Sequence, residues 1–142
     1  MLNVRSFQLS DYSPITQFMQ EVLSDECYEE TMEAFANQLS WDSELVMVAE
    51  MSGQVIGTII GTIDHHRGYY YRVAVAEAKW NGEVDAALIR ALKQRFDSRG
   101  VRTVVVPLDE HNETLLPLYR SLGYEDRHFE ASMDRKLSIC SC

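Results

Sequence analysis

Basic residues are scarce in this sequence, and long apolar runs are missing. Thirteen Lys and Arg residues stand against 22 Asp and Glu residues, which leaves a net charge of −9 at pH 7. Nucleic-acid binding relies on clustered Lys and Arg, so this composition argues against a nucleic-acid partner. No apolar run approaches the roughly 18 residues of a spanning helix, and the N-terminus has no signal-peptide core or lipidation motif. We therefore expect a cytoplasmic protein without a membrane partner.

Cysteine and proline are also scarce, with three of each in 142 residues. Cys27 is isolated, and Cys140 and Cys142 form a C-x-C at the end of the sequence. Two thiols without a nearby Cys or His partner make a weak metal site, and His65 and His66 lie in a turn without a third ligand. We expect no metal, and a reduced, frayed tail.

Length and composition otherwise indicate one ordinary globular domain. Hydrophobic residues make up 46% of the chain and charged residues 25%, without repeats or low-complexity segments. A chain of 142 residues can bury one sizeable core but is too short for two typical domains. We therefore treat residues 1–142 as a single domain.

Apolar periodicity predicts strands and helices in a definite order. In chain order, the predicted elements are a strand over 3–9, helices over 15–23 and 28–39, strands over 44–50, 55–63 and 69–76, a helix over 83–98, a strand over 101–108, a helix over 113–122 that Pro117 kinks, and a last strand over 124–137. The unit from Tyr69 to Leu108 implies two parallel neighbouring strands joined by a right-handed crossover. The expected fold class is α/β (α+β layered), with a mixed, mostly antiparallel central sheet, one parallel pair and about four helices.

The turn after the strand over 69–76 is the first candidate site. Ligands of open sheets bind beyond the carboxyl ends of parting strands, and a helix N-terminus there offers free N–H groups to an anion. Trp80 to Asp85 is thus an anion-site candidate, although a strand–helix joint without a ligand fits the spacing equally well. Tyr119 is a second candidate because its hydroxyl could donate a proton into the same cleft, although an aromatic at helical spacing is also typical of a core.

The order of elements and two segments carry a resemblance to a known family. The segments are VAVAEAKWNGEVDAALI and NETLLPLYRSLGYED. The chain resembles the GNAT superfamily of acyl-CoA-dependent N-acetyltransferases, most of all small stand-alone bacterial members with a D-G-H-R-G turn, here Asp64 to Gly68. The spacing of Asn112, Tyr119 and the L-G-Y motif at 122–124 is its most specific part, and the resemblance covers nearly the whole chain.

The resemblance implies an enzyme that uses acetyl-CoA as co-substrate and acetylates an amine of a small molecule or peptide. In the family, the central strand pairs its backbone with the pantetheine arm, and here this strand contains Val73, Ala74 and Val75. The last helix supplies an Asn near the pantetheine and often a Tyr that protonates the leaving thiolate, here Asn112 and Tyr119. The turn before the long helix wraps the CoA pyrophosphate with backbone N–H groups.

That turn departs from the family's pattern, [QR]-x-x-G-x-[GA]. Helix phase puts Trp80 at the Gln/Arg position, Glu83 at the first Gly and Asp85 at the Gly/Ala. The residues of the turn that would contact the cofactor are Trp80, Asn81, Gly82, Glu83, Val84 and Asp85. A carboxylate about 5 Å from a phosphate charge is repelled by roughly 1 to 3 kcal/mol. Two of them could weaken CoA binding a hundredfold, unless both point to solvent.

Two other functions therefore stay open. One is a non-catalytic GNAT-like binding or regulatory module that has lost CoA, since fold alone does not fix function. The other is an enzyme whose acyl donor binds where the pantetheine arm would bind but does not use the pyrophosphate site. The acidic joint between the first two helices, with Asp25, Glu26, Glu29 and Glu30, would favour a cationic amine if it borders the acceptor, although a solvated loop fits as well. The oligomeric state also stays open, a homodimer included.

Overall fold

The structure is a computed structural model that describes residues 2–76 and 82–131. One six-stranded sheet runs through it in the order β1-β2-β3-β4-β5-β6. The strands are β1 (Leu2–Ser6), β2 (Val46–Met51), β3 (Gln54–Asp64), β4 (Arg67–Val75), β5 (Thr103–Leu108) and β6 (Phe129–Ala131). The first four strands pair antiparallel, and β4 with β5 is a parallel pair. The predicted mixed sheet is confirmed, and the structure adds a short parallel pairing of β5 with β6.

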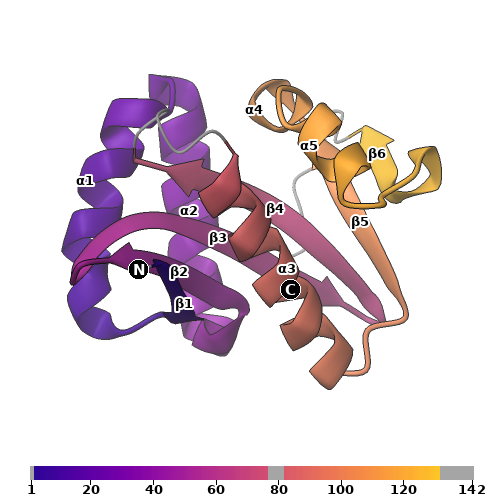
Figure 1. The fold of residues 1–142 in the computed structure, drawn as a ribbon, viewed down its shortest axis with the longest axis horizontal. Helices are drawn as coiled ribbons and strands as arrows, with labels where there is room; N and C mark the ends of the chain where they lie inside the picture. The colour runs from indigo at the N-terminus through magenta and orange to yellow at the C-terminus, as the bar shows by residue number, and fades with distance from the viewer. Residues whose placement is uncertain (1, 77–81, 132–142) are drawn as a thin grey trace.

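Helices cover both faces of this sheet (Figure 1). The five α-helices of the described residues are α1 (Tyr12–Val22), α2 (Asp25–Asp42), α3 (Glu83–Ser98), α4 (Glu110–Glu113) and α5 (Leu116–Ser121). One apolar cluster packs α3 and α5 against the sheet, and a second packs α1 and α2 against the opposite face. Across residues 2–76 and 82–131, none of the helices is long and apolar enough to cross a membrane.

The region predicted as one kinked helix over 113–122 forms two helices instead. The Asp109 carboxylate caps α4, and it accepts a hydrogen bond from the Asn112 backbone N–H at 2.8 Å. Pro117 lies in the first turn of α5, where the N–H that proline lacks would have no helical partner. The proline therefore starts a new helix, and this break sets the positions of Asn112 and Tyr119 separately.

The strands β4 and β5 pair only at their beginnings and then diverge (Figure 1). The paired residues are Arg67 to Tyr69 on β4 and Thr103 to Val105 on β5. The register of β4 with β3 shifts by one residue. Arg72 pairs with Ile60 and Tyr70 with Gly61, so Tyr71 is an extra residue in β4. A bulge of this kind bends a strand and increases its twist. The bend opens a split between the carboxyl ends of β4 and β5.

Close contact between α3 and the sheet fixes where that helix begins. A Cβ added at Gly68 would lie 2.9 Å from two ring carbons of Phe96, whose side chain is fully buried. A Cβ at Gly61 would lie 2.7 Å from a methyl group of Leu92 on the same helix. The glycines therefore let α3 approach β3 and β4 directly, which places its first turn at the end of the split.

We predict that Gly68→Ala lowers the free energy of unfolding by about 1 to 3 kcal/mol, because the added methyl group overlaps a ring that has no room to move. Urea denaturation of the variant and the parent measures the difference. Phe96→Leu removes the ring, so the double variant should lose less than the sum of the two single changes. A Gly68→Ala protein within about 0.5 kcal/mol of the parent would contradict this packing.

Candidate active site

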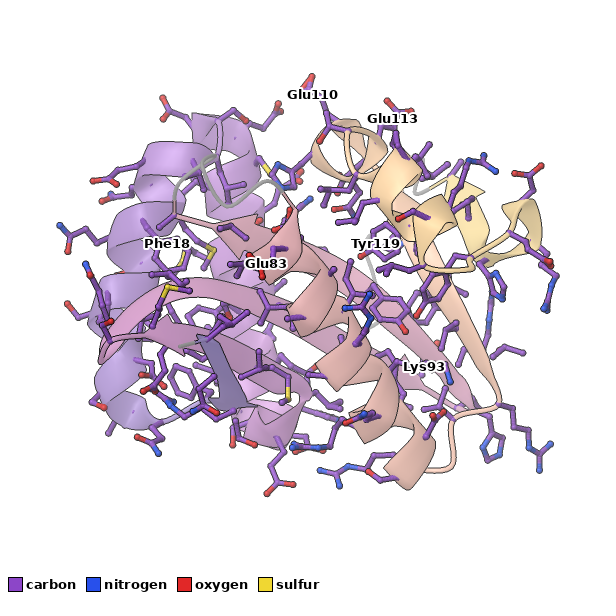
Figure 2. All side chains as sticks on the ribbon, viewed as in Figure 1. Phe18, Glu83, Lys93, Glu110, Glu113 and Tyr119 are labelled. Carbon is purple, nitrogen blue, oxygen red and sulfur yellow. The ribbon has the colours of Figure 1, made fainter. Side chains whose placement is uncertain are left out.

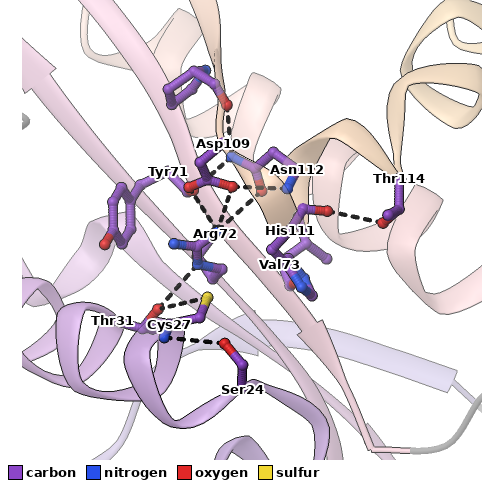
Figure 3. Close-up of polar contacts among 11 residues, drawn as sticks. Ser24, Cys27, Thr31, Tyr71, Arg72, Val73, Asp109, His111, Asn112 and Thr114 are labelled. Atoms are coloured by element: carbon purple, nitrogen blue, oxygen red, sulfur yellow. Dashed lines mark hydrogen bonds and ion pairs between the residues drawn. The ribbon is translucent and has the colours of Figure 1, made fainter. Parts of the chain in front are cut away.

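Asn112 bridges the two diverging strands (Figure 3). Its side chain is 1% exposed, and its amide nitrogen donates to the Tyr71 carbonyl of β4 at 3.0 Å and to the Pro107 carbonyl of β5 at 2.8 Å. Backbone carbonyls freed by the split thus find a donor inside the protein, as buried polar groups require. Both amide hydrogens of Asn112 are used in this bridge, so the residue fixes the width of the split.

A buried arginine supports the bridge from the α2 side. Arg72 is 1% exposed, and its Nε donates to the Thr31 hydroxyl of α2 at 3.0 Å. Its Nη1 forms an ion pair with Asp109 at 2.9 Å, and the guanidinium lies 4.8 Å from the centre of the Tyr71 ring. A buried charge is tolerated when it is paired and hydrogen-bonded in this way. Arg72 therefore ties α2, β4 and the start of α4 together.

His111 contacts the open edge of β4. Its Nε2 lies 3.0 Å from the Val73 carbonyl, and because a carbonyl only accepts, this nitrogen carries the proton. Burial lowers the pKa of His111 from its usual 6.5, so the ring is neutral at pH 7. Sequence reasoning missed His111, Arg72 and Asp109, and the one signal available was a single arginine within an otherwise apolar strand.

The backbone of β4 alternates between its two neighbours beyond the bulge. The carbonyls of Tyr71 and Val73 accept from α4 side chains on the split side, whereas Ala76 donates to β3. By alternation, Val75 also presents its backbone to the split, while Ala74 pairs with Thr58 of β3. The split therefore offers the backbone groups of Val73 and Val75 to a ligand.

The first turn of α3 begins at Gly82 with φ +80° and has no side-chain cap. Its leading N–H groups lack helical acceptors, which makes this end positive. Glu83 is exposed (Figure 2) and Val84 is buried, but Asp85 is half-buried, and burial raises the pKa of its carboxyl. The two acids therefore lie in different environments. Trp80 and Asn81 lie outside the described residues.

Tyr119 of α5 has a buried hydroxyl without a hydrogen-bond partner in the described part of the chain. Its side chain is fully buried, and its ring makes edge-to-face contacts with the rings of Tyr70 and Tyr124. Burial and the charge of Asp85 raise the pKa of Tyr119, so the hydroxyl stays protonated. A neutral buried donor without an acceptor is rare in native structures, which singles out Tyr119 among the described residues.

The remaining sequence candidates lie on α2 and in the turn between β3 and β4. Asp25, Glu26, Glu29 and Glu30 are all exposed on the first two turns of α2. His65 is exposed in the β3–β4 turn and pairs with Asp64, and no group of three metal-binding side chains occurs in residues 2–76 and 82–131. Cys140 and Cys142 fall outside the described ranges.

The comparisons with known proteins agree on one family. A family model described as the acetyltransferase (GNAT) family matches residues 14–124. An acetyltransferase of Photorhabdus laumondii is 36% identical over 102 residues, which are 72% of this chain and 71% of that protein.

Solved structures share the fold. Ard1 from Thermoplasma volcanium has a TM-score of 0.70 at 18% identity, with 87% of this chain and 82% of that chain covered. The diaminobutyrate acetyltransferase EctA from Paenibacillus lautus, solved with L-2,4-diaminobutyric acid and coenzyme A, has a TM-score of 0.65 at 18% identity over 86% of this chain and 74% of its own. With its family match, its curated relative and its shared fold, this chain belongs to the GNAT family and is an acetyltransferase of that type.

Proposed function

We propose that the protein transfers the acetyl group of acetyl-CoA directly to an amine of a small molecule or peptide. One observation carries this proposal, namely the buried hydroxyl of Tyr119, which has no hydrogen-bond partner among residues 2–76 and 82–131. Acetyl-CoA supplies an activated thioester, and its sulfur needs a proton when it leaves. Tyr119, a neutral phenol, would give it.

The open backbone of β4 supports the same proposal. Val73 and Val75 would pair with the pantetheine arm as a neighbouring strand does, and an N–H of this edge would polarise the thioester carbonyl. The first turn of α3, from Gly82, would face the pyrophosphate with its free N–H groups. Asn112 would hold β4 and β5 apart for the arm to pass between them.

The reaction then needs no covalent intermediate on the protein. The amine nitrogen forms a bond to the acetyl carbon, the carbon–sulfur bond breaks, and the thiolate takes the Tyr119 proton. The proton that the nitrogen loses on becoming an amide restores the Tyr119 hydroxyl. The structure of the Paenibacillus lautus enzyme contains an amine substrate together with coenzyme A, which supports a site of this kind. We further propose that the chain acts as a single cytoplasmic domain without a metal.

Asp85 favours a second possibility, that CoA binds weakly or has been lost. The carboxyl lies half-buried in the first turn of α3, where its ionised form would repel the pyrophosphate. Glu83 is exposed, so solvent screens its charge. Substitutions at the two positions therefore form a matched pair for measuring how much the charge of this turn weakens CoA binding.

We expect Tyr119→Phe to lower kcat by about a hundredfold without changing the affinity for CoA, because it removes only the proton donor. Steady-state kinetics and calorimetric titration with CoA measure the two effects. The variant should also unfold at an equal or higher urea concentration, since a buried hydroxyl without a partner is destabilising.

Tyr124→Phe is the matched control, because the Tyr124 hydroxyl bonds to the Tyr70 hydroxyl. It should lose about 1 kcal/mol of stability and keep its kcat. A Tyr119→Phe enzyme with parental kcat would show that another group protonates the thiolate.

We predict that Asp85→Asn tightens CoA binding by roughly tenfold to a hundredfold, whereas Glu83→Gln changes it little. Because burial raises the pKa of Asp85, the parent should also bind CoA more tightly as pH falls through that pKa, and this gain should be smaller in Asp85→Asn. Isothermal titration of both variants and the parent at several pH values measures this. Equal affinities for all three proteins would show that neither carboxylate faces the phosphates.

A further inference from the structure

A small pocket opens on the α2 side of the split, where the proposed function does not yet assign a role. It has a volume of about 160 Å³ and lies between the start of α2, the bulged part of β4 and α4. Residues along its wall include Glu26, Cys27, Glu30, Arg72, Glu110 and His111. Because His111 also touches the Val73 carbonyl at 3.0 Å, the pocket reaches the same β4 edge that the thioester would occupy.

The protonation of His111 is fixed by that contact. Nε2 donates to Val73, and burial keeps the ring neutral, so Nδ1 is left with a free lone pair. No hydrogen bond of Nδ1 to another residue occurs in the described ranges. A ring whose Nε2 is held by a backbone carbonyl and whose Nδ1 is basic can accept a proton at Nδ1.

The other groups of the pocket are less suited to that task. Arg72 is always charged and is paired with Asp109. Burial raises the pKa of the Cys27 thiol, which keeps it protonated. Glu26, Glu30 and Glu110 form no ion pair with a described Lys or Arg, so the pocket carries negative charge around a neutral histidine.

We propose that His111 is the general base that deprotonates the acceptor amine, and that this amine arrives in the pocket as an ammonium. This rests on the acetyltransferase function proposed above. The ammonium gives one proton to Nδ1 of His111, and the neutral amine attacks the acetyl carbon. The nitrogen–carbon bond forms, the carbon–sulfur bond breaks, and the sulfur takes a proton from Tyr119. The second amine proton leaves the amide nitrogen and restores the Tyr119 hydroxyl, and His111 releases its proton to solvent. Ammonium and thioester thus become amide, thiol and one released proton.

The charges around His111 set the expected pH dependence. Arg72 of β4 opposes a second positive charge, while Asp109 and Glu110 near α4 and Glu26 and Glu30 on α2 favour it. Burial dominates, so the pKa of His111 lies below 6.5. Activity should therefore rise with pH through the pKa of His111 and reach a plateau near neutrality.

The test uses the full chain, acetyl-CoA and two probe amines. Spermidine is cationic at neutral pH, whereas hydroxylamine is largely uncharged and needs no base. His111→Gln retains a donor for the Val73 carbonyl but cannot titrate, and exposed His66→Gln is the matched control. We expect His111→Gln to lower kcat for spermidine by about a hundredfold, to flatten the acid side of the pH profile and to leave both hydroxylamine turnover and the KM for acetyl-CoA unchanged.

Each other outcome is decisive. If His111→Gln keeps the parental pH profile with spermidine, or slows both amines alike, the role of His111 as base is wrong and the acetyltransferase function stands. If the parent acetylates hydroxylamine but not spermidine, the ammonium pocket is wrong. If the parent acetylates neither amine, calorimetric titration with CoA decides which proposal is wrong. Absence of CoA binding overturns the acetyltransferase function, whereas CoA binding without either product overturns the ammonium pocket.

Discussion

The split between β4 and β5 is the constraint on which the rest of the molecule depends. Two parallel strands that part expose backbone groups in the interior, and those groups need partners. Asn112 supplies donors to a carbonyl on each strand, and Arg72 with Asp109 holds the helix that carries Asn112. A cleft can therefore exist in the middle of a sheet because a few polar side chains replace the missing ladder.

Apolar contacts position the helix on one side of this split, and polar contacts position the helices on the other side. On one face, glycines of β3 and β4 let α3 lie directly on the sheet, so apolar packing sets where its first turn begins. On the other face, the Arg72 contacts with Thr31 and Asp109 fix α2 relative to α4. Hydrogen bonds are directional and packing is not, which is why the face that would orient an acceptor is the more polar one.

Elements with strong local signals could be predicted from the sequence. The helix over 83–98 has the bounds that its apolar period and Gly100 indicated, and the antiparallel run of β2 to β4 follows alternation and turn residues. The resemblance to the GNAT superfamily also drew attention to Asn112 and Tyr119 as candidates. Local sequence patterns could not predict contacts between residues that are distant in the chain. Arg72, for example, contacts Thr31 and Asp109, each more than thirty positions away. Likewise, the sequence predicted that Pro117 kinks one helix, because only tertiary contacts show that a new helix starts there.

The open edge of β4 has a consequence for how copies of this protein behave in solution. An unpaired strand edge is a template on which another chain can add a strand, and such edges promote aggregation. Here the edge lies inside the sheet, with β5 beside it, and side chains of α4 already bond its Tyr71 and Val73 carbonyls. A second polypeptide with side chains on both faces would have to displace those contacts. The same recess that offers backbone groups to a slender ligand thus prevents a second polypeptide from adding a strand at the β4 edge.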